Sequence, residues 1–183
     1  MMRIITGSAR GTRLLSLDGD ATRPTSERVK EAVFSMIQFE LEGRRVLDLF
    51  GGCGQLALEA LSRGANSALI CDSNAEAVKI IKENAKKTHL YEKCVILTAD
   101  ALRMIKNSKE KFSLIFIDPP YASDLAVRAL RMLAEQNMIS DKGIVILETS
   151  HPIDEIPDSL KLRREARYSK TYITVLEKEA DEK

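Results

Sequence analysis

Residues 113–121 read Ser-Leu-Ile-Phe-Ile-Asp-Pro-Pro-Tyr. Their first half is a bulky apolar run of strand length without a polar face, which is typical of a strand covered on both sides in a parallel sheet. The two prolines keep Asp118 and Pro119 extended and offer no N–H group. The stretch therefore predicts a buried strand that ends in hydrogen-bond acceptors beside an aromatic ring, although prolines here commonly do no more than end a strand.

Strand-like and helix-like segments alternate around this run. The expected strands are 45–50, 67–71, 95–97, 113–117 and 143–148, and the expected helices are 26–41, 55–63, 74–88, 101–106 and 124–136. The alternation predicts an α/β fold with a doubly wound, mostly parallel sheet and helices on both faces. Residues 159–177 break the pattern and are expected to form an antiparallel hairpin, followed by a frayed, charged tail over 177–183.

The composition fits one main domain, because 183 residues with 44% hydrophobic content can bury a sizeable core. We expect residues 1–21 to form a small β-hairpin extension and residues 22–183 to form the main domain. Neither a membrane-spanning run nor a secretory signal is visible, so a cytoplasmic protein is expected. The three cysteines form no C-x-x-C pair, which indicates neither a disulfide framework nor a zinc site.

Net charge is only +1, but basic residues gather near the two ends of the chain. Residues 1–13 carry three arginines and no acid, and residues 161–172 carry five basic residues and one acid. Local patches, rather than net charge, govern phosphate binding. The distribution favours a nucleic-acid partner, with two solvated basic loops as the alternative.

Each of the first four expected strands ends at or just before an aspartate. Ligands of open parallel sheets bind beyond the carboxyl ends of the strands, although aspartate in such places also commonly caps the next helix. The first strand is followed by three glycines, and residues 52–57 fit the dinucleotide fingerprint G-x-G-x-x-A. Together these features predict a nucleoside-containing cofactor, with NAD and S-adenosylmethionine both open. The four acids are Asp48, Asp72, Asp100 and Asp118.

Residues 118–121 resemble the [D/N/S]-P-P-[Y/F] signature of S-adenosylmethionine-dependent amino-methyltransferases. Asp118 and the Pro119 carbonyl can accept the two N–H bonds of a planar amine, and Tyr121 can stack on its ring. Such positioning does most of the catalysis when the methyl donor is already a strong electrophile, and it needs no metal. An NAD enzyme is disfavoured because nothing in the sequence calls for the acid or base of hydride transfer.

Six stretches together are similar to the RsmD family, bacterial methyltransferases that act on the N2 amine of a guanine in small-subunit (16S) ribosomal RNA. They are residues 3–7 with 10–11, 23–25, 28–34, 47–54, 59–65 and 118–121. The resemblance implies a seven-stranded class I methyltransferase sheet and an N-terminal hairpin used on RNA. It implies S-adenosylmethionine as cofactor, no metal and no membrane, and a monomer acting on ribosomal RNA or the assembling small subunit.

The resemblance also implies which residues form the site. Catalytic roles fall to Asp118, Pro119 and Tyr121. Cofactor binding falls to Asp48, Phe50, Gly52, Gly54, Asp72, Ser73, Asp100 and Ala101. Substrate binding falls to Arg10, Arg13, Arg23, Thr25 and Tyr121.

The sequence departs from the family pattern at three places. Cys53 stands where serine is frequent and is a candidate reactive thiol, Asp72 replaces the usual glutamate, and Ser169 replaces a glycine in the last turn. The motif itself leaves other substrates open, namely an adenine in DNA or RNA or a protein glutamine. A non-catalytic ribosome-assembly factor on the same scaffold is a further alternative.

Overall fold

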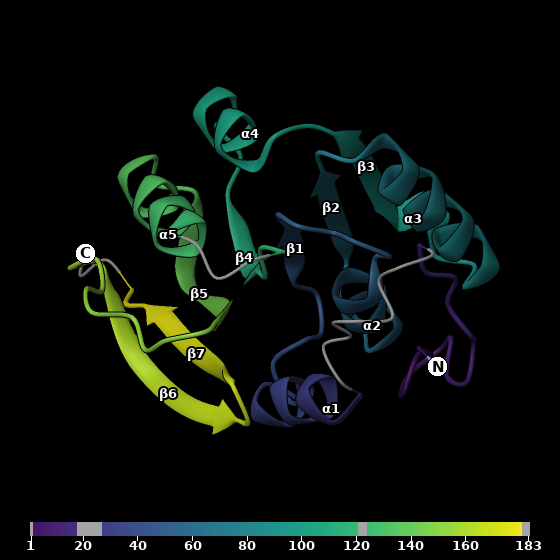
Figure 1. Cartoon of the computed structure of the whole chain (residues 1–183), viewed down its shortest axis with the longest axis horizontal. Helices are drawn as coiled ribbons and strands as arrows, with labels where there is room; N and C mark the ends of the chain where they lie inside the picture. Colours follow the sequence, from purple (N-terminus) through teal and green to yellow (C-terminus); the bar gives the residue numbers. More distant parts are fainter. Residues whose placement is uncertain (1, 18–26, 121–123, 181–183) are drawn as a thin grey trace.

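The computed structural model describes residues 2–17, 27–120 and 124–180. Seven strands form one twisted sheet in the order β3-β2-β1-β4-β5-β7-β6 (Figure 1). The first five pair in parallel and the last two pair antiparallel, as predicted. The strands are β1 (Arg45–Asp48), β2 (Ser67–Asp72), β3 (Cys94–Thr98), β4 (Phe112–Ile117), β5 (Ile139–Thr149), β6 (Leu160–Tyr168) and β7 (Thr171–Lys178).

Helices cover both faces of the sheet (Figure 1). Neighbouring residues of a strand point to opposite faces, so Val46 of β1 joins one hydrophobic cluster and Leu47 joins the other. The first cluster lies under α1 (Glu27–Met36), α2 (Gln55–Ser62) and α3 (Ala75–Lys87), and the second under α4 (Ala101–Asn107) and α5 (Leu125–Glu135). A short 3₁₀ turn, η2 (Tyr91–Lys93), precedes β3.

The sheet order defines where a ligand belongs. From β1 the chain moves outward through β2 to β3, then returns to the other side of β1 as β4. The strand order therefore reverses between β1 and β4. In open α/β sheets, the crevice beyond the carboxyl ends at such a reversal is the usual binding site.

Several predicted boundaries are wrong. The strand expected over 143–148 begins at Ile139. The helix expected over 26–41 ends at Met36, because the chain turns there while Ile37 and Leu41 stay buried; residue 26 lies outside the described residues. The strand expected over 45–50 ends at Asp48, where the backbone leaves the sheet to form the glycine loop. The tail expected from 177 is part of β7 as far as Lys178, whose ammonium reaches Asn137 and Asp141.

The final hairpin is longer than predicted. The apolar piece at 160–162 extends as β6 to Tyr168. β6 lies at one edge of the sheet and pairs with β7 alone. Most of its charged side chains face solvent, so a search for apolar runs does not find the full length of this strand. Ser169 adopts φ 57, in the left-handed region that favours glycine.

The N-terminal segment folds back on itself as predicted, but its described part pairs through a single β-bridge between Arg3 and Arg13. Its tip is held against α2. Gly7 lies so close that an added Cβ would fall 1.8 Å from the Ser62 carbonyl oxygen, and Ser62 Oγ accepts a hydrogen bond from Ala9 N at 2.9 Å. Residues 18–21 of the expected hairpin lie outside the described residues.

A buried ion pair fixes the base of this segment. Lys30 of α1 and Glu59 of α2 are fully buried, with 3.6 Å between Nζ and Oε2. Glu59 also accepts hydrogen bonds from the backbone N–H groups of Ile5 (2.8 Å) and Thr6 (3.0 Å). Lys30 donates to the Arg3 carbonyl at 2.6 Å. We call this group of contacts the Lys30–Glu59 junction.

No helix within the described ranges is long and apolar enough to cross a membrane.

Candidate active site at the carboxyl ends of the strands

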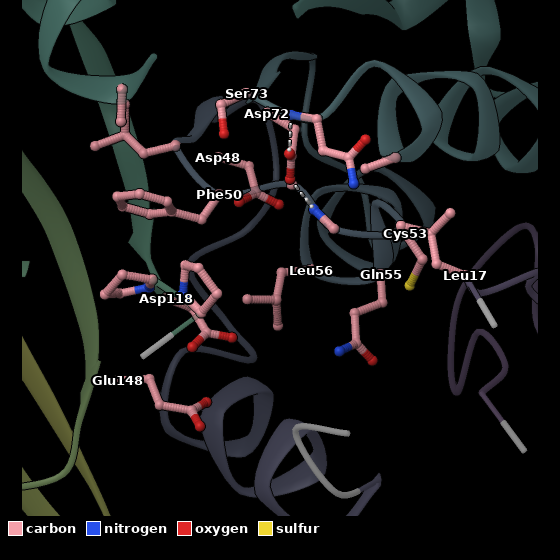
Figure 2. Close-up of a pocket in the computed structure, with 18 of the residues that line it drawn as sticks. Leu17, Asp48, Phe50, Cys53, Gln55, Leu56, Asp72, Ser73, Asp118 and Glu148 are labelled. Carbon is pink, nitrogen blue, oxygen red and sulfur yellow. Dashed lines mark hydrogen bonds between the residues drawn. The ribbon is translucent and has the colours of Figure 1, made fainter. Parts of the chain in front are cut away.

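A cavity of about 370 Å³ opens beyond the carboxyl ends of the strands, at the point where the strand order reverses (Figure 2). Its wall is acidic, and none of the described residues that line it is a lysine, arginine or histidine. The predicted site residues among its lining are Asp48, Phe50, Gly52, Asp72, Ser73, Asp100, Ala101, Asp118 and Pro119. The structure thus brings together nine residues from four separate segments between Asp48 and Pro119.

Asp48 is the most buried acid of the cavity, with 1% of its surface exposed. Its pKa is raised to about 7, chiefly by burial and to a lesser extent by the nearby Asp72, while the backbone N–H groups of Phe50 and Ala57 oppose the shift. Its Oδ1 atom is buried and has no hydrogen-bond partner among the described residues. A buried acceptor without a donor is costly, so this oxygen indicates a ligand that brings a cationic or N–H donor.

Asp72 ties the glycine loop to the end of β2. Its Oδ2 accepts from Gly52 N and its Oδ1 accepts from Asn74 N, both at 2.8 Å (Figure 2). Each carboxylate oxygen has further lone-pair capacity, so the same group can also accept from hydroxyls in the cavity. The acid is therefore fixed in orientation before any ligand arrives.

The remaining predicted cofactor residues divide into two groups. Ser73 and Phe50 lie on the wall of the cavity, and Asp100 caps α4 by accepting from Arg103 N at 2.9 Å while also lining the cavity. Gly54 is outside the lining. It begins α2 with φ 82, and an added Cβ would meet Ile81 and Leu58 at 3.3 Å, so it shapes the loop from the core side.

Asp118 and Pro119 form the far end of the cavity, directly after β4. Pro119 is buried and Asp118 is half-buried. Figure 2 shows the Asp118 carboxylate directed into the cavity, below Asp48 and Phe50. Tyr121, the aromatic member of the predicted motif, lies outside the described residues.

Glu148 and Gln55 are among the lining residues that the sequence analysis missed. Glu148 at the end of β5 is 8% exposed and faces the cavity near Asp118. Gln55 begins α2, lines the cavity, and has a buried Oε1 atom without a hydrogen-bond partner among the described residues. A signal existed for Glu148, because it ends the fifth strand as aspartates end the first four.

Two of the predicted substrate-binding arginines, Arg10 and Arg13, are not among the residues that line the cavity. Arg10 and Arg13 are exposed, and the same segment contributes Met2 and Leu17 to the cavity wall. Asn84 of α3 holds the segment there, since its side-chain amide bonds both the N–H and the carbonyl of Leu15. Arg23 and Thr25 lie outside the described residues.

The basic cluster at 161–172 is divided by ion pairs. Arg163 forms a two-pronged salt bridge with Glu40, and Lys161 pairs with Glu179. Arg167 lies opposite Tyr172, which in turn lies opposite Thr149 at the end of β5. Only the Arg167 end of the hairpin therefore shares the edge of the sheet on which the cavity opens.

Cys53 lines the cavity and is 6% exposed. Burial raises the pKa of its thiol to about 11. The thiolate is the reactive form of cysteine, so burial disfavours a reactive thiol at this position. Within the described ranges, no group of three His, Cys, Asp or Glu side chains could hold a metal ion.

Comparison with known proteins places the chain in a family. The model of the family described as "Conserved hypothetical protein 95" matches residues 2–177. The chain belongs to this family, the RsmD family. A Bacillus subtilis relative named "Putative rRNA methyltransferase YlbH" is 33% identical over 97% of this chain and 99% of the relative. "Ribosomal RNA small subunit methyltransferase D" of Escherichia coli K12 is 29% identical over 90% of this chain and 83% of the relative.

A solved structure agrees over the whole length. The protein described as "Putative methyltransferase yhhF from Escherichia coli" matches with a TM-score of 0.89 at 26% identity, covering 98% of this chain and 99% of that one. The predicted family, the class I fold and the methyltransferase activity with S-adenosylmethionine are thereby confirmed.

The cavity fits that cofactor by charge. S-adenosylmethionine carries a sulfonium and an ammonium cation, and the described lining offers five acids, Asp48, Asp72, Asp100, Asp118 and Glu148, without an opposing base. The unpaired Oδ1 of Asp48 is suited to the ammonium, and Asp72 to ribose hydroxyls. The same five acids would repel the pyrophosphate of NAD, which favours S-adenosylmethionine among the two cofactors that the glycine loop left open.

Proposed function

We propose that this chain transfers a methyl group to the N2 amine of a guanine in small-subunit ribosomal RNA. The observation that carries the proposal is the position of Asp118 and Pro119 in the same cavity as Asp48 and Asp72. It supports an arrangement in which the acceptor amine meets the methyl donor at the β4 end of the cavity.

The proposed roles follow from the chemistry of the side chains. An amine conjugated to a purine ring is a poor nucleophile, because its lone pair is delocalised. Asp118 and the Pro119 carbonyl accept its two N–H bonds and turn the lone pair toward the methyl group, while Tyr121 stacks on the ring. When S-adenosylmethionine is bound, its sulfonium supplies an electrophilic methyl group, so orientation is the main task left to these residues.

Cofactor binding falls to the β1 and β2 ends of the cavity. Asp48 binds the ammonium group, and Asp72 with Ser73 binds the ribose. Asp100 and Ala101 border the adenine, with Phe50 on one side of it. Gly52 brings the backbone close to the cofactor, and Gly54 supports the loop from the core side.

The substrate class is supported by the names of the relatives and by exposed charge. The relatives are named for ribosomal RNA methylation, and Arg10 and Arg13 are exposed on the segment that lines the cavity. We propose that these two, with Arg23 and Thr25, bind the RNA. We propose a monomer as the working unit, acting on small subunits that assemble in the cytoplasm.

The test is methyl transfer from labelled S-adenosylmethionine to small ribosomal subunits from cells that lack this methylation, compared with naked ribosomal RNA, duplex DNA and bulk protein. We expect label on one guanine of the subunit and none with Asp118→Ala. Label on adenine or protein would move the substrate to another amine while keeping the site. Absence of transfer to every acceptor, despite tight cofactor binding, would support a non-catalytic assembly factor instead.

A further inference from the structure

We propose that Asn84 is a positioning residue that joins the N-terminal segment to the glycine loop, so that S-adenosylmethionine and RNA find their sites formed together. The inference rests on the proposed function, because it takes the exposed Arg10 and Arg13 as contacts to RNA. It goes beyond that function by adding a buried residue of α3 and a link between the two binding sites.

The side chain of Asn84 bonds to both parts of the chain. It is fully buried, with 0% of its surface exposed. Its Oδ1 accepts from Leu15 N at 2.8 Å, and its Nδ2 donates to the carbonyl oxygens of Leu15 and Cys53, both at 2.9 Å. Both amide N–H bonds are used, and partners of opposite kind fix which way the amide points. One side chain therefore ties the N-terminal segment to the loop that follows β1.

The glycine loop is held from two directions. Asp72 accepts from Gly52 N at 2.8 Å at the wall of the cavity, and Asn84 binds the carbonyl of the next residue, Cys53. The Cys53 thiol also contacts the N-terminal segment, with 3.6 Å between its sulfur and the Met2 sulfur. The loop and the segment therefore meet both directly and through Asn84.

The N-terminal segment takes part in both proposed binding sites. Its Met2 and Leu17 line the cavity, and Figure 2 shows Leu17 on the same side of the cavity as Cys53. Its Arg10 and Arg13 are exposed. Any change in how this segment is attached should therefore affect the binding of the cofactor and of the RNA together.

Asn84 anchors a different part of the segment from the other two anchors. The Lys30–Glu59 junction binds the backbone at residues 5 and 6, and Ser62 binds it at residue 9. Asn84 binds the returning arm at residue 15. Without Asn84 the tip of the segment keeps its anchors, whereas the arm from Arg13 to Leu17 is held less firmly.

A loosened arm has a consequence for both ligands. Loss of Asn84 leaves three backbone groups without this partner, which favours a detached arm. A ligand that binds only the attached form loses affinity in proportion to the fraction of molecules in that form. Once one ligand has fixed the arm, the second meets the native site. The two ligands should therefore become cooperative in the variant, although neither affects the other in the native protein.

The test measures each affinity with and without the other ligand. Calorimetry gives the Kd of S-adenosylhomocysteine, and filter binding gives the Kd of small ribosomal subunits that lack the methyl group. In the native protein, saturation with one ligand should change the Kd of the other by less than about twofold. In Asn84→Ala, each Kd alone should rise by about tenfold, the scale of one hydrogen bond, and should return to within about twofold of the native value when the other ligand is saturating.

Two further variants distinguish this role from a general loss of stability. Asn84→Leu keeps a side chain of similar volume but removes the three hydrogen bonds, so it should behave like Asn84→Ala and keeps the test available if that variant does not fold. Ile139→Val removes a buried methyl group at the first residue of β5, opposite Phe112. It should lower the midpoint of urea denaturation without changing either Kd.

The possible results are distinct. Unchanged affinities in both Asn84 variants, with guanine methylation by the native protein, would overturn this inference alone. Weaker binding that the second ligand does not restore, or the same cooperativity in Ile139→Val, would also overturn it, because either result would show a general disturbance of the fold. If the native protein neither binds small subunits nor methylates a guanine, the proposed function is wrong and this inference with it.

Discussion

The Lys30–Glu59 junction and the acidic cavity both bury charged groups, but they differ in how those groups are paired. In the junction, both carboxylate oxygens of Glu59 accept backbone N–H bonds, and Arg63 Nε adds a contact of 2.8 Å. In the cavity, Asp48 keeps an oxygen without a partner among the described residues. Full pairing by the protein marks a structural site, and incomplete pairing marks a place for a ligand.

The pKa shifts of Lys30 and Asp48 show the same contrast. Burial lowers the pKa of Lys30, but the nearby Glu59 opposes this shift. In the cavity, the acid Asp72 adds to the effect of burial on Asp48 and raises its pKa further. A cationic ligand would relieve that repulsion. The junction therefore serves the fold, and the cavity is arranged for a positively charged cofactor.

The largest effect is expected in the junction. Glu59→Ala would leave Lys30 as an unpaired buried ammonium and two backbone N–H groups without acceptors, so we expect the free energy of unfolding to fall by about 3–5 kcal/mol. Urea denaturation measures it. Glu76→Ala is the matched control, because Glu76 pairs with Lys79 on the exposed surface and its removal should cost less than about 1 kcal/mol. Equal changes would show that the junction is no more than a surface pair.

In the cavity, Asp118→Ala should affect the reaction rather than the fold. We expect kcat to fall by about 10²–10³-fold, as when one preorganised polar group is removed, with the affinity for S-adenosylhomocysteine largely retained. Asp154→Ala serves as the control, because Asp154 is an exposed acid on the wall of another cavity, of about 540 Å³, beside α5. A change in kcat of less than a few-fold would exclude Asp118 as the amine acceptor.

Asp48 predicts a pH effect of intermediate size. Since its folded-state pKa is raised to about 7, the folded protein retains a proton that the unfolded chain has released between about pH 4 and 7. The free energy of unfolding of the cofactor-free protein should therefore fall as the pH rises from about 4 to about 7.

The same proton must leave when a cofactor ammonium binds. The affinity for S-adenosylhomocysteine should rise by up to about tenfold per pH unit below pH 7 and level off above it. Calorimetry across this range measures the slope, with Asp48→Asn as the comparison. A pH-independent affinity in the native protein would remove Asp48 from the ammonium site.

The cavity was more predictable from sequence than the junction. The apolar runs predicted each parallel strand, because a strand buried on both faces is recognisable locally. Topology then placed the aspartates at one edge. Glu148 carries the same local signal as these aspartates, an acid at the end of an apolar run, but its place beside Asp118 follows from the register of β4 and β5, which no local pattern reveals.

The junction could not be predicted in this way. Lys30 lies next to the apolar stripe of α1, and Glu59 lies within the short helix α2. Charged residues at such positions usually face solvent. Their burial depends on the N-terminal segment folding over both helices, which is a tertiary event. The early end of α1 has the same origin, because the chain turns to bring Leu41 into the core.

The smallest expected effect concerns the two basic regions at the chain ends. Arg10 and Arg13 are exposed, whereas Arg163 is engaged by Glu40. If the first two bind RNA phosphates, the double variant Arg10→Ala with Arg13→Ala should reduce the slope of log affinity against log salt by about 0.7 for each phosphate that is no longer neutralised. Arg163→Ala should leave the slope unchanged, since its charge is already matched within the protein. If Arg163→Ala reduced the slope and the double variant did not, the RNA would bind the outer face of β6 rather than the N-terminal segment.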